Sequence, residues 1–232
     1  MGRGGMTVVA VLVAGAVWAQ EPAPPVRRGP RPNMQMMSEA LGVKCIYCHV
    51  ATKTEDLDFR SEANPKKQVA RLMVAMTADI NASVSAATLK PPTDTAQVQC
   101  VTCHRGRTDP RSLQEILLSS VQEGGVEPTI ARYRELRERY YGRDAYDFSE
   151  RTLLLVAQQI VERGPDAAIA LLTLNLEHFP KSADSWTLIG IAHTRKLRND
   201  EARAAFAQAL AINPKHSVAE GYLYQLQQYK RK

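Results

Sequence analysis

All four cysteines of this 232-residue chain fall in two copies of one five-residue pattern. The first copy reads CIYCH at residues 45–49, and the second reads CVTCH at residues 100–104. This Cys-x-x-Cys-His pattern is typical of covalent attachment of c-type haem. Cysteines three residues apart share one helical face and can reach the two vinyl groups of one porphyrin, and the histidine that follows can turn its imidazole to the iron. The sequence therefore predicts two covalently attached haem c groups, with Cys45, Cys48, Cys100 and Cys103 as attachment residues and His49 and His104 as iron ligands.

Two other uses of four cysteines explain less of the pattern. Paired zinc knuckles usually stand about 15–20 residues apart, whereas 51 residues separate Cys48 from Cys100 here. Structural disulfides are compatible with an exported chain. Neither alternative accounts for a histidine after each cysteine pair, so the pattern favours haem.

The first 32 residues read as an export signal followed by a spacer. Residues 1–19 combine a positive charge at Arg3, an apolar run over residues 6–17 and a cleavage site after Ala19, the organisation of a signal peptide. The run is shorter than the ~20 residues of a membrane span, although an uncleaved anchor remains the alternative. Residues 20–32 form a Pro-rich linker, which favours an extended and semi-stiff conformation. We expect a periplasmic protein with no stable membrane span after signal cleavage.

The composition argues against a nucleic-acid partner and against wholesale disorder. The chain has 30 basic and 24 acidic side chains, a net charge of +6, without a long basic stripe. Hydrophobic residues make up 44% and charged residues 23%, as in ordinary soluble proteins.

The sixth iron ligand separates electron transfer from ligand chemistry. The other three histidines, His178, His193 and His216, stand far downstream. They are therefore not available as ligands within the segment that carries both motifs (residues 33–110), called the haem segment below. Methionines are available, because Met34, Met36 and Met37 precede the first motif, and Met73 and Met76 precede the second. Apolar residues at helical spacing over residues 64–81 predict a helix on which Met73 and Met76 share a face. Methionine is also a common core filler, so the residues alone leave both roles open.

Several stretches resemble the photosynthetic reaction-centre cytochrome c subunit family. They are MQMMSEALGVKCIYCHV at residues 34–50, the pair Asp58-Phe59, ARLMVAMTADIN at residues 70–81 and VTCHRG at residues 101–106. The resemblance covers roughly residues 33–108 and implies that a helix bearing a methionine ligand precedes each motif. It selects Met34, eleven residues before the first cysteine, and Met76, four residues before the Ile80-Asn81 pair, with Met73 as the runner-up. The photosynthetic subunits carry four haems, whereas this chain has two motifs and is similar to the dihaem relatives of non-photosynthetic bacteria.

The C-terminal part repeats with a period of 34 residues. Pro180 and Pro214 are 34 apart, as are Ala168 and Ala202, and this is the period of tetratricopeptide repeats. The pattern predicts one repeat over roughly residues 149–181, a better-fitting second one after it, and a capping helix over residues 215–229. Two repeats are fewer than the three usually needed for independent stability, so we expect them to pack on a helix at residues 127–141, on the haem segment or on another subunit. The repeats would serve as a protein-docking surface or as a stabilising appendage.

Together these features predict an all-α protein. Its parts are a loop-rich dihaem cytochrome c domain with short helices (33–110), a helical connector broken at Gly124-Gly125 (111–147) and a tetratricopeptide-repeat domain (148–232). The predicted function is electron transport between redox partner proteins, with no enzyme activity. The alternative is a dihaem peroxidase or reductase, or a haem-based sensor, with one open iron. The lack of a spare histidine in the haem segment counts against an enzyme.

Overall fold

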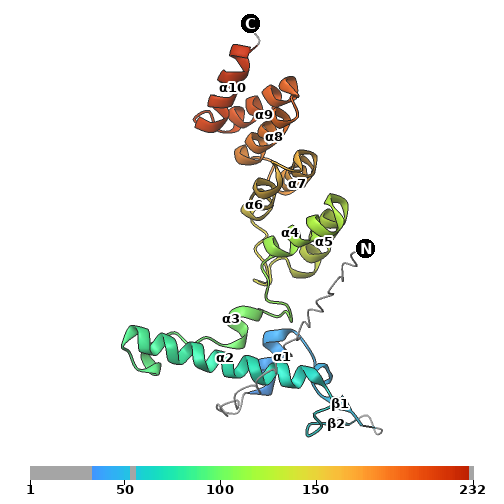
Figure 1. Ribbon diagram of the computed structural model, residues 1–232, viewed down its shortest axis with the longest axis vertical. Coiled ribbons are helices and arrows are strands. Elements are labelled where there is room, and N and C mark those ends of the chain that lie inside the picture. Colours follow the sequence, from blue (N-terminus) through green and yellow to red (C-terminus); the bar gives the residue numbers. More distant parts are fainter. Residues whose placement is uncertain (1–32, 53–55, 230–232) are drawn as a thin grey trace, which may run out of the picture.

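A computed structural model describes residues 33–52 and 56–229, so the predicted signal peptide and Pro-rich linker lie outside the described residues. The described chain contains ten α-helices and one two-stranded ribbon, which confirms the all-α prediction. Figure 1 shows a helical array, α4 to α10, stacked along the long axis, with the segment that carries both motifs at one end. None of the described helices is long and apolar enough to cross a membrane.

The haem segment is loop-rich, as predicted. It comprises α1 (Met34–Leu41), the 3-10 turn η1 (Cys45–Tyr47), β1 (Val50–Ala51), β2 (Leu57–Asp58), α2 (Pro65–Thr88), the turn η2 (Pro92–Asp94) and α3 (Cys100–His104). The strands pair antiparallel, with Val50 opposite Asp58. Asn33 caps α1 by accepting hydrogen bonds from two backbone amides, and Asn64 caps α2 by accepting one from Lys66, ahead of a proline at the first helical position.

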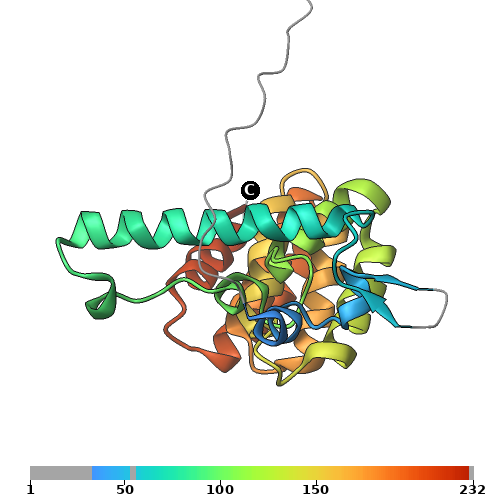
Figure 2. The same cartoon turned by 90° about the horizontal axis from the view of Figure 1, so that it is seen from below.

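The expectation of short helices in this segment is wrong for α2. This helix has 24 residues and extends past the side of the array in the view from below (Figure 2). It continues beyond the predicted Asn81 because no glycine or proline follows Pro65 until after it ends. Leu89 terminates it in the left-handed conformation, with φ +54°.

The array consists of seven consecutive helices joined by short turns, except that residues 141–149 connect α5 to α6. They are α4 (Leu113–Gly124), α5 (Val126–Tyr140), α6 (Glu150–Ile160), α7 (Pro165–His178), α8 (Ala183–Arg195), α9 (Asn199–Ile212) and α10 (Ser217–Tyr229). The predicted break between α4 and α5 is confirmed at Gly125, whose φ of +80° favours glycine. The capping helix predicted at residues 215–229 corresponds to α10.

Positions related by the 34-residue period occupy equivalent places in consecutive hairpins. Ala168 and Ala202 are both fully buried, as are Leu172 and Phe206. The second hairpin is tight, because a Cβ on Gly190 would lie 2.5 Å from the Phe206 ring. The period therefore corresponds to two hairpins, α6–α7 and α8–α9, that pack alike.

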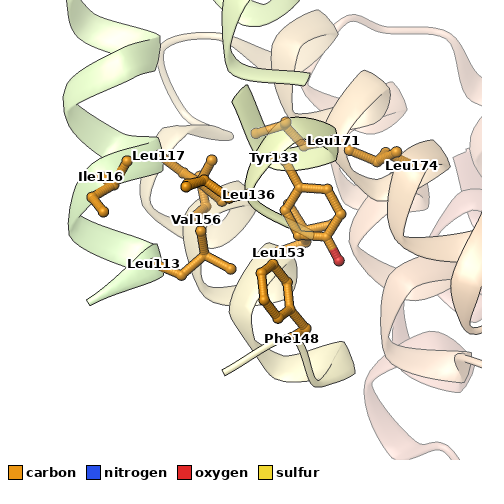
Figure 3. Packing of buried hydrophobic residues seen from close by; sticks show 10 residues of the cluster. All are labelled: Leu113, Ile116, Leu117, Tyr133, Leu136, Phe148, Leu153, Val156, Leu171 and Leu174. Atoms are coloured by element: carbon orange, nitrogen blue, oxygen red, sulfur yellow. The ribbon is translucent and has the colours of Figure 1, made fainter. Parts of the chain in front are cut away.

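The hydrophobic core belongs almost entirely to the array. Its first cluster joins α4, α5, α6 and α7 around Tyr133 and Phe148 (Figure 3). Two further clusters lie between α6 and α9 and beneath α10. Between residues 33 and 112 of the described chain, Ala40 is the only buried hydrophobic residue. The haem segment thus lacks an apolar core made of its own side chains.

The array should lose stability between pH 7 and pH 5. Nε2 of His178 and Nδ1 of His193 are buried without a hydrogen-bond partner among the described residues. Burial lowers the pKa of both imidazoles below the ordinary value of about 6.5. The unfolded chain therefore binds protons first, so the free energy of unfolding should fall as the pH drops through about 6.5. Urea unfolding of the holoprotein, followed by circular dichroism at several pH values, measures this slope.

A double variant, His178→Gln with His193→Gln, should flatten that slope. Carboxylates such as Glu62, whose pKa Arg71 and Lys67 lower to about 2, are the same in both proteins, so their contribution cancels when the two slopes are compared. An unchanged slope in the double variant would contradict the assignment to these two histidines.

Candidate haem-binding sites

The second motif forms a short helix that places its cysteines on one side. α3 (Cys100–His104) starts after Gln99, whose backbone amide donates to the Thr102 hydroxyl at 3.0 Å. Cys100 and Cys103 are free thiols one helical turn apart, the first half-buried and the second exposed. Both can therefore reach one flat ligand laid against α3.

The imidazole of His104 is held by a hydrogen bond at one nitrogen. Its Nδ1 lies 2.9 Å from the backbone carbonyl oxygen of Arg107. The tautomer that carries its proton on Nδ1 donates this bond, which leaves the Nε2 lone pair free to bind a metal. The geometry of His104 is that of a metal-ligating histidine with an oriented ring.

The first motif is fastened to the start of α2. The carbonyl of Tyr47 accepts a hydrogen bond from the Asn64 side chain at 3.0 Å, and the Lys66 ammonium lies 3.7 Å above the Tyr47 ring centroid. Cys45 is an exposed free thiol and Cys48 a half-buried one. Burial raises the pKa of the Cys48 thiol, and the charge of Lys66 opposes that rise.

His49 differs from His104 in its surroundings. Its Nδ1 is buried without a hydrogen-bond partner among the described residues. The ring packs edge-on against Phe59 at 4.9 Å between centroids, because the β1–β2 ribbon folds the chain back over the motif. The predicted ligand His49 therefore stands in a largely apolar setting.

A cavity of about 580 Å³ lies beside the second motif. Its walls include Cys100 and Val101 from α3, Val74 and Ala78 from α2, and Met37 from α1. This volume is in the range of pockets that hold small ligands and cofactors. The thiol of Cys100, a predicted attachment residue, thus borders a mostly apolar space.

The predicted methionine ligands stand on the helices that precede the motifs, but outside this cavity. Met34 is the first residue of α1 and is 58% exposed. Met76 is 44% exposed and Met73 39%, and both belong to an exposed apolar stripe along α2. Met36 and Met37 line the cavity instead. Met34 and Met76 stay predictions as iron ligands, since no methionine sulfur is brought to either histidine by a described contact.

The two motif units are joined through backbone contacts. Gly106, just after the second motif, donates its amide to the carbonyl of Ala40 in α1 at 2.8 Å. Gly42, just before the first motif, approaches so closely that a Cβ there would lie 2.2 Å from the Gly106 carbonyl oxygen. Asn81 of α2 also pairs with both backbone groups of Val98, at 2.7 and 3.0 Å. These contacts hold α1, α2 and α3 in one unit.

The sequence did not indicate that Arg107 belongs to the site of the second motif. This residue is 6% exposed, and its guanidinium contacts the backbone of His104. Its position three residues after the motif histidine is the only signal that the sequence offers, because its burial depends on residues far along the chain.

The thiols and histidines of both motifs fit covalently held haem. Each motif presents two free thiols and a histidine, and the segment around them exposes large apolar side chains on α1, α2 and α3. Within the described part of the chain, no three His, Cys, Asp or Glu side chains are grouped as a metal site, so the two cysteine pairs do not converge on one zinc ion.

Comparison with known proteins agrees with this chemistry. No curated protein matches the chain. Residues 32–117 match the family model described as the photosynthetic reaction centre cytochrome C subunit, and this segment includes both motifs and the helices around them. The segment is thus similar to a family of cytochromes, which implies covalently bound haem c and indicates a haem-based role in electron transfer.

Proposed function

We propose that this protein is an exported dihaem c-type cytochrome that carries electrons between redox partner proteins of the periplasm. The observation that carries the proposal is the contrast between the two halves of the structure. The array buries 25 hydrophobic residues, whereas the described residues 33–112, which carry both motifs, bury one and leave eleven large hydrophobic side chains exposed. A segment this small completes its core with a cofactor more readily than with side chains, and two porphyrins would cover these surfaces.

Each motif has a defined set of roles in this proposal. Cys45 and Cys48 hold one haem through thioether bonds, and His49 is its proximal ligand. Cys100 and Cys103 hold the other, with His104 as proximal ligand. Haem c supplies the one-electron ferrous–ferric couple when it is bound. Met34 and Met76 are the proposed sixth ligands, and a thioether favours the ferrous state.

The repeats are proposed as the surface for a protein partner. Their support is the regular stacking of α6 to α10, which resembles tetratricopeptide hairpins in period and packing. The α4–α5 pair packs against α6 and α7 and shares one core cluster with them. In this proposal the pair serves as the additional layer that two repeats need, and its helix α5 is one of the three packing partners that the sequence leaves open.

The methionine assignment predicts a specific response to carbon monoxide. In the purified wild-type protein both irons are six-coordinate, so the oxidised form should show a methionine–iron charge-transfer band and the reduced form should not change on addition of carbon monoxide. Met34→Ala and Met76→Ala should each open one iron and allow carbon monoxide to bind one haem per chain. Optical spectra recorded through a potentiometric titration measure both properties.

Met73→Ala is the matched control, because Met73 lies on the same stripe of α2 and is equally exposed. It should leave the spectra unchanged. If Met73→Ala opens the second iron and Met76→Ala does not, the ligand is Met73 and the assignment to Met76 is wrong. A carbon monoxide shift in the wild type would contradict a pure carrier and favour an enzyme or sensor, which peroxide turnover would then distinguish.

A further inference from the structure

One charged side chain is buried in the described part of the chain, and it follows the second motif directly. Arg107 is 6% exposed, although an ionised group loses its hydration on burial and needs compensating contacts. The nearby carboxylate of Asp109 feels its charge but forms its own ion pair with Arg111, at 2.8 Å. Arg107 is therefore held by something other than a salt bridge.

Toward the second motif, Arg107 and His104 each donate hydrogen bonds to the other. The backbone amide and Nε of Arg107 both donate to the carbonyl oxygen of His104, at 3.0 and 3.2 Å. The Arg107 carbonyl in turn accepts from Nδ1 of His104 at 2.9 Å. The orientation of the imidazole therefore depends on where Arg107 is fixed.

On the array side, the same guanidinium contacts two separate parts of the helical stack. Nη1 donates to the carbonyl of Arg111 at 2.6 Å, immediately before the capping residue Ser112 of α4. The central guanidinium carbon lies 4.1 Å from the ring centroid of Tyr146. A cation over an aromatic face is held more strongly when both are shielded from water.

Tyr146 is itself fixed by the array. It lies between α5 and α6, packs edge-on against Tyr140 at 5.3 Å and Phe148 at 6.1 Å, and borders the first core cluster. Arg107 therefore contacts both His104 and Tyr146, and so connects the His104 imidazole to the core of the array.

We propose that Arg107 is a positioning residue through which the array orients His104 and raises the reduction potential of the haem held there. The inference rests on the proposed function, because it requires His104 to bind iron. Ferric iron carries one more positive charge than ferrous iron, and a buried cation interacts strongly across a low-dielectric interior. A fixed guanidinium beside the proximal histidine therefore favours the ferrous state.

The test is a potentiometric titration of the full-length holoprotein. In Arg107→Met the charge is lost with little change in length, so the reduction equilibrium constant of the second haem should fall about tenfold, or 59 mV for one electron. Arg107→Lys keeps the charge and should restore most of this loss. The haem on His49 should keep its wild-type potential in both variants and is the internal reference.

Arg105→Met is the matched control for charge. It removes the same charge from the residue next to His104, but Arg105 is exposed and water screens its field. This variant should leave both potentials near their wild-type values. If Arg107→Met and Arg105→Met retain both haems and give equal potentials, the proposal for Arg107 is overturned.

A second pair of variants decides the matter if Arg107→Met does not retain the second haem. Tyr146→Phe keeps the aromatic face and should keep the wild-type potential, whereas Tyr146→Leu removes that face and should lower the potential of the second haem. Equal potentials in these two variants overturn the proposal. The haem content of the wild type is measured alongside, and a chain without haem at residues 100–104 would contradict the proposed function instead.

Discussion

Replacing Cys100 and Cys103 together with serine should halve the covalently bound haem, from two groups per chain to one. A hydroxyl does not form the thioether link, so the second haem has no covalent attachment and is lost during denaturing extraction. Cys45→Ser with Cys48→Ser should remove the other haem and leave the second. Absorbance of the pyridine haemochrome, divided by chain concentration after acid–acetone extraction, measures the content.

These two double variants are matched controls for each other, and together they separate the haem assignment from its alternatives. The two motifs lie on different elements, η1 and α3, and each has its own histidine, so each loss should be independent. A zinc site built from both cysteine pairs would be destroyed by either double variant and would show no haem at all. A double variant that still holds two covalent haems would contradict the assignment of its motif.

Gly42→Ala should destabilise the holoprotein by about 2–5 kcal/mol, since overpacking costs about 1–3 kcal/mol and a left-handed residue with a Cβ costs about 1–2 kcal/mol. Gly42 has φ +66°, and its missing Cβ would stand 2.2 Å from the carbonyl oxygen of Gly106. Backbone atoms on both sides leave no flexible side chain to move, so α1 and α3 must separate. The hydrogen bond from Gly106 to Ala40 should be lost in the process. Urea unfolding monitored at the haem absorbance measures the change.

Gly106→Ala is the control for this prediction. Gly106 also has a positive φ, +79°, but a Cβ there would meet no atom within 4 Å. Gly106→Ala should therefore cost only the left-handed conformation of a residue with a Cβ, about 1–2 kcal/mol. Equal losses of stability in the two variants would show that the close approach of Gly42 to Gly106 does not matter.

Local periodicity explains what could be predicted from the sequence. The 34-residue spacing corresponds to two hairpins, because Ala168 and Ala202 recur where helices must approach closely. Two adjacent glycines interrupt a helical pattern and so mark the break between α4 and α5. Apolar spacing predicts the helix at residues 64–81 but not its continuation to Thr88, since the apolar pattern fades while helix-compatible residues continue.

Contacts between distant residues explain what could not be predicted. Gly42 contacts Gly106, 64 positions later in the sequence, and Arg107 contacts Tyr146 of the connector. No local sequence pattern predicts either of these contacts. The methionines show the same limit: the resemblance selects Met34 on α1 and Met76 on α2, whereas the cavity beside Cys100 is lined by Met36 and Met37. Which sulfur meets which iron is a tertiary property, and the carbon monoxide experiment addresses it.

The intact mass of the purified, denatured wild-type chain tests the central claim most directly. Two covalently attached haems predict a single species whose mass equals that of the polypeptide plus two haem groups, with both Cys-x-x-Cys-His peptides carrying haem after proteolysis. A species with one haem, with none, or with cysteines joined as disulfides would contradict the account.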